Sequence, residues 1–209
     1  MSELKTSLLA AFDHAVAPLE LEVSEQQRQL LVDFVLMMHK WNKAYNLTAI
    51  RDIDQMVIRH LLDSLGVLAY INSAPVLDVG TGAGLPGIPL ALAQPDKQFF
   101  LLDSNGKKTR FLTQVKIELG IENIEVIHAR VEDFIPDIKF EIVICRAFAA
   151  LNTVLERTQH LVTSTTRILA MTGKDDFPPL VDGFTQVDSH QLNIAWLDEE
   201  RRLLDIRPT

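Results

Sequence analysis

A glycine-dense turn at residues 78–87 is the segment of the sequence best suited to chemistry. It reads Asp-Val-Gly-Thr-Gly-Ala-Gly-Leu-Pro-Gly and directly follows a short apolar run. Glycine tolerates positive φ and lets a ligand lie against bare backbone, and free N–H groups at a helix start favour a polar or anionic group. Asp103 ends the next apolar run, where a carboxylate can accept both hydroxyls of a ribose. Turn and acid together predict a site for a nucleoside cofactor.

Two glycine registers fit this turn, and they favour different cofactors. Gly82, Gly84 and Gly87 match the dinucleotide pattern G-x-G-x-x-G, whereas Gly80, Gly82 and Gly84 match the methyltransferase pattern of an acid followed by x-G-x-G-x-G. We favour S-adenosylmethionine, because Asp78 precedes the first glycine, where a carboxylate suits a cationic methionine group better than a pyrophosphate. Gly80 also follows the apolar run directly. Spacing alone leaves an NAD-dependent oxidoreductase open.

Two further segments supply candidate site residues. Val131 and Glu132 follow the third apolar run, where a backbone amide and an apolar side chain can hold an adenine ring. Acids are also common at the start of a helix, so this stretch is weak evidence by itself. Arg146 ends the fourth run and can bind a phosphate or reach a guanine edge. The alternative role for Arg146 is an ion pair with Asp78 or Glu132.

The end of the fourth run also bears on the methyl acceptor. It lacks the Asn/Asp-Pro-Pro-aromatic tetrad with which many enzymes polarise an exocyclic amine. A ring nitrogen with a free lone pair, such as guanine N7, loses no proton and depends mainly on placement, an effect worth up to ~7–11 kcal/mol. Cys145 offers a nucleophile for methylation of a pyrimidine at C5, but we favour a small buried residue there.

The periodicity of the chain indicates the elements that position these residues. Short apolar runs alternate with helical stretches, which predicts a mostly parallel sheet with helices on both faces. We expect strands at 76–79, 98–102, 124–128, 141–145 and 167–171, and helices near 87–94, 107–119 and 152–162. Gly120 is placed to end the second of these helices. Residues 184–206 predict two more strands, paired antiparallel at the sheet edge.

The first part of the chain is expected to be helical throughout. Residues 1–72 predict a helical N-terminal extension, and residues 73–209 a Rossmann-like α/β domain. Ser24 and Gln27 have the form of a capping box. An apolar stripe of helical spacing follows the box, formed by Leu30, Phe34, Met38, Trp41 and Tyr45. The stripe stops near Asn46, and a second helix is expected after Asp52.

Length and composition set broad limits. The 209 residues, 47% of them hydrophobic, are enough for one good-sized domain with a real core. The net charge of −8 argues against coating nucleic acid through global charge, but it allows a local basic face. One cysteine excludes an internal disulfide and a Cys-based zinc cage, and we expect no metal. With neither a secretory signal nor an apolar run of membrane-spanning length, we expect a cytoplasmic protein. We also expect a monomer.

Several strings together resemble one family, the ribosomal RNA small subunit methyltransferase G (RsmG/GidB) family. They span about residues 24–155 and include His-Lys-Trp-Asn-Lys-Ala-Tyr-Asn-Leu-Thr at 39–48, Arg-His-Leu-Leu-Asp-Ser at 59–64, the glycine turn, Leu-Asp-Ser at 102–104 with Gly-Lys-Lys at 106–108 and Arg-Phe-Leu at 110–112, and Arg-Ala-Phe-Ala at 146–149. The family often has serine at the position of Cys145. It commonly has a lysine at that of Thr172, where Lys174 lies close by in this chain.

The resemblance implies a class I S-adenosylmethionine-dependent methyltransferase with a seven-stranded, mostly parallel sheet and a helical N-terminal part. The implied reaction methylates N7 of a guanine in a loop of 16S rRNA near the decoding region, with 16S rRNA or the 30S subunit as the partner. The implied cofactor contacts are Gly80, Leu85, Val131, Glu132 and Arg146, with Asp103 as the ribose acceptor. We add Asp78, Gly82 and Gly84 to the cofactor site, and take Arg146 as the catalytic residue.

An RNA-binding face is expected from basic residues near the site. The candidate RNA contacts are Lys40, Lys43, Arg59, His60, Lys107 and Arg110. These groups can equally be solvated surface. Trp41 and Tyr45 can stack on a flipped base, worth ~1–3 kcal/mol, but their place on the apolar stripe favours packing in the core. The acidic net charge keeps a small-molecule methyltransferase open, and a non-catalytic RNA-binding module is a further alternative.

Overall fold

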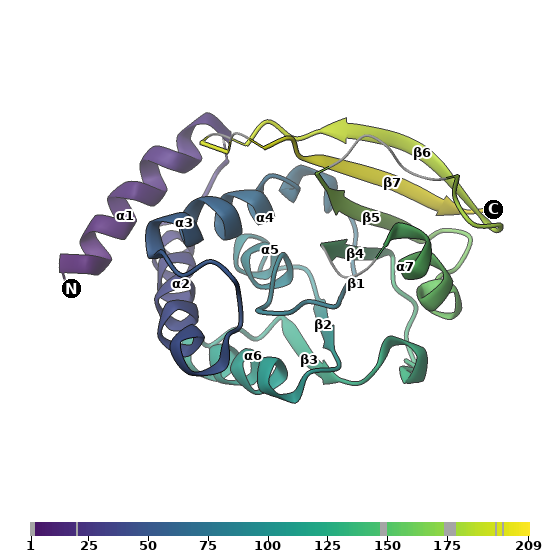
Figure 1. Cartoon of the computed structure of the whole chain (residues 1–209), viewed down its shortest axis with the longest axis horizontal. Coiled ribbons are helices and arrows are strands. Elements are labelled where there is room, and N and C mark those ends of the chain that lie inside the picture. Colours follow the sequence, from purple (N-terminus) through teal and green to yellow (C-terminus); the bar gives the residue numbers. More distant parts are fainter. Residues whose placement is uncertain (1–2, 20, 147–149, 174–178, 195, 198) are drawn as a thin grey trace.

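The computed structural model describes residues 3–19, 21–146, 150–173, 179–194, 196–197 and 199–209 (Figure 1). Seven strands form one sheet in the order β3-β2-β1-β4-β5-β7-β6. Their bounds are β1 Val76–Val79, β2 Phe99–Asp103, β3 Ile124–His128, β4 Ile142–Arg146, β5 Arg167–Thr172, β6 Phe184–Gln191 and β7 Arg202–Pro208. The pairs among β1 to β5 are parallel, whereas β7 runs antiparallel to β5 and β6. The predicted sheet, including the antiparallel pair at its edge, is therefore confirmed.

The central strands β1, β4 and β5 are buried on both faces, as is typical of a parallel sheet covered by helices. All four residues of β1 are buried. Successive positions enter opposite cores: Val76 belongs to a cluster with helices α2, α5 and α6, while Leu77 and Val79 belong to a cluster with α7. Fully burying a side chain of this size stabilises the fold by about 1.5–3 kcal/mol. These two cores fix the strand ends from which the functional side chains project.

Of the helix ends predicted for the main domain, one is confirmed at Gly120 and one lies earlier than expected. The helices of the main domain are α5 Gly87–Ala93, α6 Gly106–Leu119 and α7 Leu151–Thr158, with the short 3-10 turns η4 Val131–Asp133 and η5 Gln159–Leu161. Two more 3-10 turns, η1 Ala17–Leu19 and η3 Leu68–Tyr70, lie in the N-terminal extension. Gly120 ends α6 with a φ of 63°, which confirms its predicted role. The helix expected at 152–162 ends earlier, at Thr158, and continues as η5.

The N-terminal helices pack against α5 and α6 and share the core of the main domain rather than forming one of their own. The elements are α1 Glu3–Val16, α2 Glu25–Tyr45, α3 Ile53–Met56, the π-helical turn η2 Val57–Leu62 and α4 Asp63–Leu65. Ser24 accepts a hydrogen bond from the Gln27 amide at 3.3 Å, and the Gln27 side chain accepts one from the Ser24 amide at 2.8 Å. The capping box is thus confirmed, as are the helix end at Asn46 and the Asp52 cap of α3. Buried residues of these helices join the same cluster as Val76.

Candidate active site

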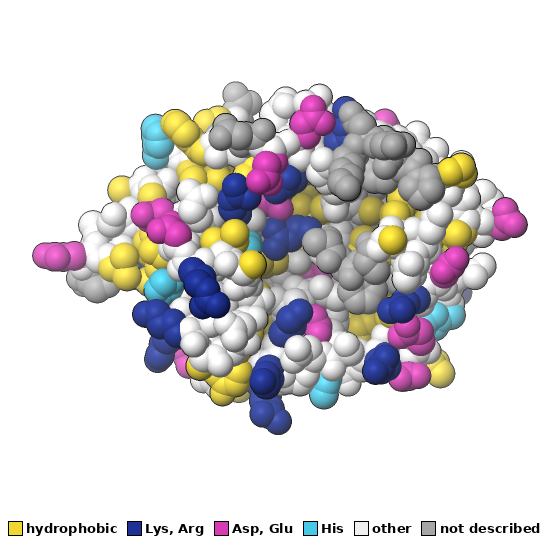
Figure 2. Space-filling view, in the orientation of Figure 1, with side chains coloured by type: hydrophobic (Ala, Val, Ile, Leu, Met, Phe, Trp, Pro, Cys, Tyr) yellow, Lys and Arg dark blue, Asp and Glu magenta, His cyan; other side chains and the backbone are white. Residues whose placement is uncertain are grey.

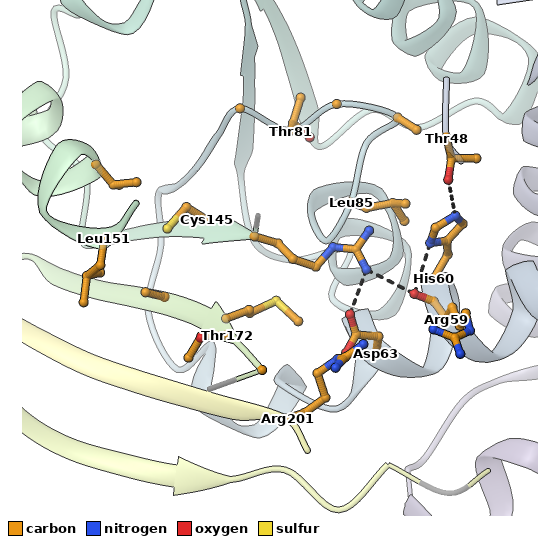
Figure 3. A pocket seen from close by; sticks show the side chains of 18 of the residues that line it. Thr48, Arg59, His60, Asp63, Thr81, Leu85, Cys145, Leu151, Thr172 and Arg201 are labelled. Atoms are coloured by element: carbon orange, nitrogen blue, oxygen red, sulfur yellow. Dashed lines mark hydrogen bonds and ion pairs between the residues drawn. The ribbon is translucent and has the colours of Figure 1, made fainter. Parts of the chain in front are cut away.

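A cavity of about 920 Å³ opens where the helical extension meets the carboxyl ends of β1, β4 and β5 (Figure 3). Ligand sites of open α/β sheets lie at this edge. Most of the lining comes from three regions: the extension, with Leu47, Thr48, Ile50, Arg59, His60 and Asp63; the glycine turn, with Gly80, Thr81, Gly82, Ala83 and Leu85; and the strand ends, with Cys145, Arg146, Ala170, Met171, Thr172 and Gly173. The start of α7, Lys108 of α6, and Arg201 and Leu204 at β7 complete it. Lys and Arg side chains gather in and around the hollow on this face (Figure 2). The structure therefore brings Gly80, Gly82, Leu85 and Arg146 together in one cavity.

The glycines of the turn serve two different physical needs. Gly80, Gly82 and Gly84 have φ values of 68°, 62° and 88°, a region that side chains with a Cβ rarely adopt. A Cβ on Gly84 would lie 2.5 Å from Ile88 Cγ1 and 2.8 Å from Leu112 Cδ2, so this glycine is required for packing. A Cβ on Gly82 would find no atom closer than 3.7 Å. Gly82 therefore leaves its backbone accessible to a ligand, whereas Gly84 allows the turn to pack closely against Ile88 and Leu112.

Asp78 lies under this turn and holds its two ends together. Its Oδ2 accepts hydrogen bonds from the Thr81 hydroxyl at 2.7 Å and from the Gly87 amide at 2.8 Å. The carboxyl group is fully buried, and this burial raises its pKa to about 6 despite both hydrogen bonds. Asp78 is absent from the cavity lining. The expected contact with a cationic methionine group stays a prediction: Oδ2 is used by the turn, and Oδ1 has no hydrogen-bond partner among the described residues.

Asp103 contacts the glycine turn directly. Its Oδ2 accepts a hydrogen bond from the Gly82 amide at 2.9 Å, and its Oδ1 accepts one from the Asn105 amide at 2.8 Å. The sequence had placed this acid and this turn in one site, and the structure brings them together. Lys108 lines the cavity with its Nζ 3.8 Å from Asp103 Oδ2. Lys108 was not among the candidate residues, although it lies in the quoted Gly-Lys-Lys string.

Arg146 is held at the cavity by the helical extension. Its Nη1 donates to Asp63 Oδ2 at 2.8 Å and to the Arg59 carbonyl at 3.1 Å. The ion pair suggested with Asp78 or Glu132 is wrong: Asp78 is committed to the turn, and Glu132 pairs with Arg157 at 3.1 Å. Arg201 shares the same carboxylate, with its Nε 3.0 Å from Asp63 Oδ1. Sequence reasoning missed both Asp63 and Arg201, although Asp63 lies in the quoted string at 59–64.

His60 is a neutral cavity residue rather than one of the surface cations expected above. Its Nδ1 lies 3.0 Å from the Arg59 carbonyl, and its Nε2 lies 2.9 Å from the Thr48 hydroxyl. Because a carbonyl only accepts, Nδ1 carries the proton and Nε2 accepts from Thr48. Burial, reinforced by the nearby charge of Arg146, lowers the pKa of His60 to about 4.

Cys145 also lines the cavity but is not a thiolate. It is buried, and this burial raises the pKa of its thiol to about 12. The neighbouring carboxylate of Asp78 raises the pKa further. A nucleophilic cysteine needs a lowered pKa and an accessible sulfur. The preferred interpretation, a small buried residue at a strand end, is therefore confirmed.

Of the remaining candidates that the structure describes, only Arg59 lines the cavity. Val131 is buried in the core cluster that contains α7, and the Glu132 side chain is exposed. Four of the basic candidates, Lys40 and Lys43 on α2 and Lys107 and Arg110 on α6, are exposed. Arg59 lines the cavity and pairs with Glu199 at 2.8 Å. Residues 147–149 of the Arg-Ala-Phe-Ala string, and Lys174, lie outside the described residues.

Trp41 and Tyr45 form an aromatic stack with two different environments. Their ring centroids are 5.0 Å apart, and Trp41 also lies 5.6 Å from Phe111 of α6. Trp41 is half-buried against the core, as its place on the stripe predicted. Tyr45 is 40% exposed at the end of α2, so the stripe does not bury it.

The described residues contain neither a metal-ligand cluster nor a membrane-spanning helix. No group of three or more His, Cys, Asp or Glu side chains among them is arranged to hold a metal ion. No described helix has the length and apolar character that crossing a bilayer requires. The charged side chains that line the cavity are Arg59, Asp63, Lys108, Arg146 and Arg201, beside neutral His60.

The chain is similar to proteins of one family over most of its length. Residues 27–202 match the model of the family described as rRNA small subunit methyltransferase G. Relatives with that name include one from Shewanella piezotolerans, 46% identical over 95% of this chain and 98% of its own length. One from Shewanella frigidimarina is 47% identical over 91% and 94%, and one from Marinobacter nauticus is 48% identical over 90% of each chain.

Solved structures of methyltransferases share the fold. Magnesium protoporphyrin IX methyltransferase from Synechocystis, solved with bound S-adenosylmethionine, covers 85% of this chain and 98% of its own, with a TM-score of 0.57 and 15% identity. A S-adenosylmethionine-dependent methyltransferase from Aquifex aeolicus covers 80% and 97%, with a TM-score of 0.56 and 16% identity. These matches confirm the predicted class I methyltransferase fold.

Proposed function

The chain belongs to the rRNA small subunit methyltransferase G family, and from this membership we propose that it transfers a methyl group from S-adenosylmethionine to N7 of a guanine in 16S rRNA. The target we propose is a loop near the decoding region, presented by free 16S rRNA or by the 30S subunit. The observation that supports the proposal is the direct hydrogen bond between the Gly82 amide and Asp103, because it joins the two features that a nucleoside site needs.

The residues present suit S-adenosylmethionine. Gly80, Gly82 and Leu85 offer backbone and an apolar side chain at the cavity wall. Asp103 uses one lone pair of each oxygen for a backbone amide, so each oxygen retains acceptor capacity for a ribose hydroxyl. Val131 follows β3 on the same edge of the sheet, where the adenine would lie. When bound, the cofactor would supply an electrophilic methyl group at its sulfonium.

The cavity also suits an acceptor with no proton to lose. Guanine N7 carries a lone pair, so its methylation requires orientation rather than a general base. The Cys145 thiol is protonated, and His60 Nε2 already accepts from Thr48. Arg146 is the group that can orient a guanine, because a guanidinium donates to the O6 and N7 edge in the bidentate manner that arginine favours. At N7 such a bond has to be released before attack, so we assign Arg146 to O6 and to a neighbouring phosphate.

We propose that an exposed basic face on α2 and α6 binds the phosphates of the substrate. The two helices pack against each other (Figure 1), and they carry Lys40, Lys43, Lys107 and Arg110. Tyr45, at the end of α2, is exposed enough to stack on a base. Neutralising phosphates with these groups releases counterions, so binding should weaken steeply with salt.

A methyl-transfer assay tests this function. The protein is incubated with S-adenosylmethionine labelled in its methyl group and with 16S rRNA, free or within 30S subunits that lack the modification. We expect label at a single guanine, located by chain cleavage specific to N7-methylguanine. Label at another atom or in another RNA would correct the proposed target. If neither free 16S rRNA nor the 30S subunit is labelled, the proposal is refuted. Methylation of metabolites but not of RNA would favour a small-molecule methyltransferase, the alternative suggested by the net charge of −8.

A further inference from the structure

Asp63 is a buried carboxylate shared by two arginines from distant parts of the chain (Figure 3). It is 3% exposed, and each of its oxygens accepts from one guanidinium, Oδ2 from Arg146 at 2.8 Å and Oδ1 from Arg201 at 3.0 Å. Arg146 ends β4, whereas Arg201 directly precedes β7. A buried charge is tolerated when it is paired and hydrogen-bonded. The helical extension therefore contributes the anion that joins two strand ends at the cavity.

A second contact from the same segment fixes the orientation of Arg146. The carbonyl of Arg59 accepts from Arg146 Nη1 at 3.1 Å and from His60 Nδ1 at 3.0 Å. Arg59 lies in the π-helical turn η2, immediately before Asp63 begins α4. Both contacts of Arg146 use the single nitrogen Nη1. Within the described part of the chain, Nε and Nη2 of Arg146 have no hydrogen bond, so they remain for a ligand in the cavity.

We propose that Asp63 is a positioning residue that orients the guanidinium of Arg146 toward the reacting base and keeps Arg201 beside it. This inference rests on the proposed function, since it assigns Asp63 to the same reaction. Loss of the carboxylate should lower turnover more than it weakens the cofactor site. The turn and Asp103, which would hold the cofactor, make no hydrogen bond to Asp63.

A second buried aspartate–arginine pair provides a matched control. Asp205 on β7 is 6% exposed and accepts from Arg167 Nη2 at 2.7 Å and from Arg167 Nε at 3.1 Å. Neither residue lines the cavity. Asp63→Asn and Asp205→Asn thus make the same chemical change in similarly buried pairs, one at the site and one away from it.

The test compares these two variants in three measurements: the melting temperature, the affinity for S-adenosylhomocysteine and the steady-state methylation of 30S subunits. We expect both variants to lose thermal stability, and both to bind S-adenosylhomocysteine within about threefold of the wild type. We expect kcat to fall about tenfold or more in Asp63→Asn, while Asp205→Asn stays within about twofold. Asp63→Glu keeps the negative charge, so its kcat should lie between those of Asp63→Asn and the wild type. The same variant tests the inference if Asp63→Asn does not fold.

A double variant separates positioning from a general structural effect. If Asp63 acts through Arg146, then Asp63→Asn combined with Arg146→Ala is no slower than Arg146→Ala alone. The inference would be overturned if the fold-losses of kcat in the two single variants multiply in the double variant. It would also be overturned if Asp63→Asn and Asp205→Asn lose kcat equally. A crystal structure of Asp63→Asn gives a readout independent of turnover, because an unmoved Arg146 guanidinium also overturns it. Failure of the proposed function is distinct, since the wild type itself would then leave 16S rRNA unmethylated.

Discussion

Replacing Asp103 with alanine is the most direct test of the proposed cofactor site. The carboxylate already accepts one amide on each oxygen, from Gly82 at 2.9 Å and from Asn105 at 2.8 Å. Each oxygen has a second lone pair, and we assign these to the two hydroxyls of the cofactor ribose. A hydrogen bond to a charged group contributes about 1.5–3 kcal/mol. The variant loses both such bonds but lets water solvate the hydroxyls, so we expect a net loss of about one bond.

That loss corresponds to a roughly 10- to 150-fold increase in Kd, because about 1.4 kcal/mol is a factor of ten. Isothermal titration calorimetry with S-adenosylhomocysteine measures it without requiring RNA or turnover. Asp96→Ala is the control: this aspartate is exposed in the turn before β2, at the opposite end of the same strand. A cooperative melt of each variant confirms that it is folded. A Kd for Asp103→Ala within about twofold of the wild type would remove Asp103 from the site and with it the main support for the cofactor assignment.

Three further predictions concern pH, packing and RNA binding. The pKa of His60 is lowered from 6.5 to about 4 in the folded protein, so below pH 6.5 the unfolded chain binds a proton that the folded chain does not. The neutral His60 therefore stabilises the fold fully above pH 6.5, and this contribution is lost as the pH falls to 4. Across this pH range the free energy of unfolding of the wild type, measured with denaturant, should fall by about 3 kcal/mol more than that of His60→Gln. Parallel pH dependences of the two proteins would contradict this prediction. In Gly87→Ala the new Cβ would clash with Leu101 Cδ2 and lie 2.7 Å from Asp78 Oδ2. We therefore expect the free energy of unfolding, measured with urea, to fall by about 1–3 kcal/mol. An unchanged free energy of unfolding would show that the turn rearranges to accept the Cβ. Lys40→Glu and Lys43→Glu should weaken RNA binding and make its dependence on salt shallower, whereas Lys139→Glu, an exposed control, should change neither.

The parts of the site that follow from local sequence were predictable. The glycine turn and Asp103 carry a pattern of residue types at fixed spacing, because a positive φ and a strand-end carboxylate each demand particular residues. The same holds for the Ser24 capping box and for Gly120, whose left-handed conformation ends α6. Strand positions followed from short apolar runs, since a parallel sheet buries both faces of its strands.

The side-chain partners in the cavity were not predictable in this way. Asp63 and Arg146 are 83 residues apart, and Arg201 lies 138 residues beyond Asp63. Such pairs leave no periodic signal, because either partner alone is compatible with an ordinary surface charge. His60 read as part of a basic cluster, yet the π-helical turn η2 buries it against Thr48. A hydrophobic stripe shows which side of a helix is buried, but not whether that side faces the core or lines a cavity.

The charges around the cavity bear on how an acidic protein would carry out the proposed reaction on RNA. A net charge of −8 repels a polyanion at long range, but that repulsion is screened beyond about 8–10 Å at physiological ionic strength. Productive contact then depends on local groups, and the cavity arginines are mostly neutralised there: Arg59, Arg146 and Arg201 share the carboxylates of Asp63 and Glu199. A neutralised arginine holds a phosphate less tightly than an unpaired one, yet it keeps the geometry of its donors. It follows that the exposed lysines of α2 and α6 should set affinity for the RNA, while the paired arginines should set which base is methylated.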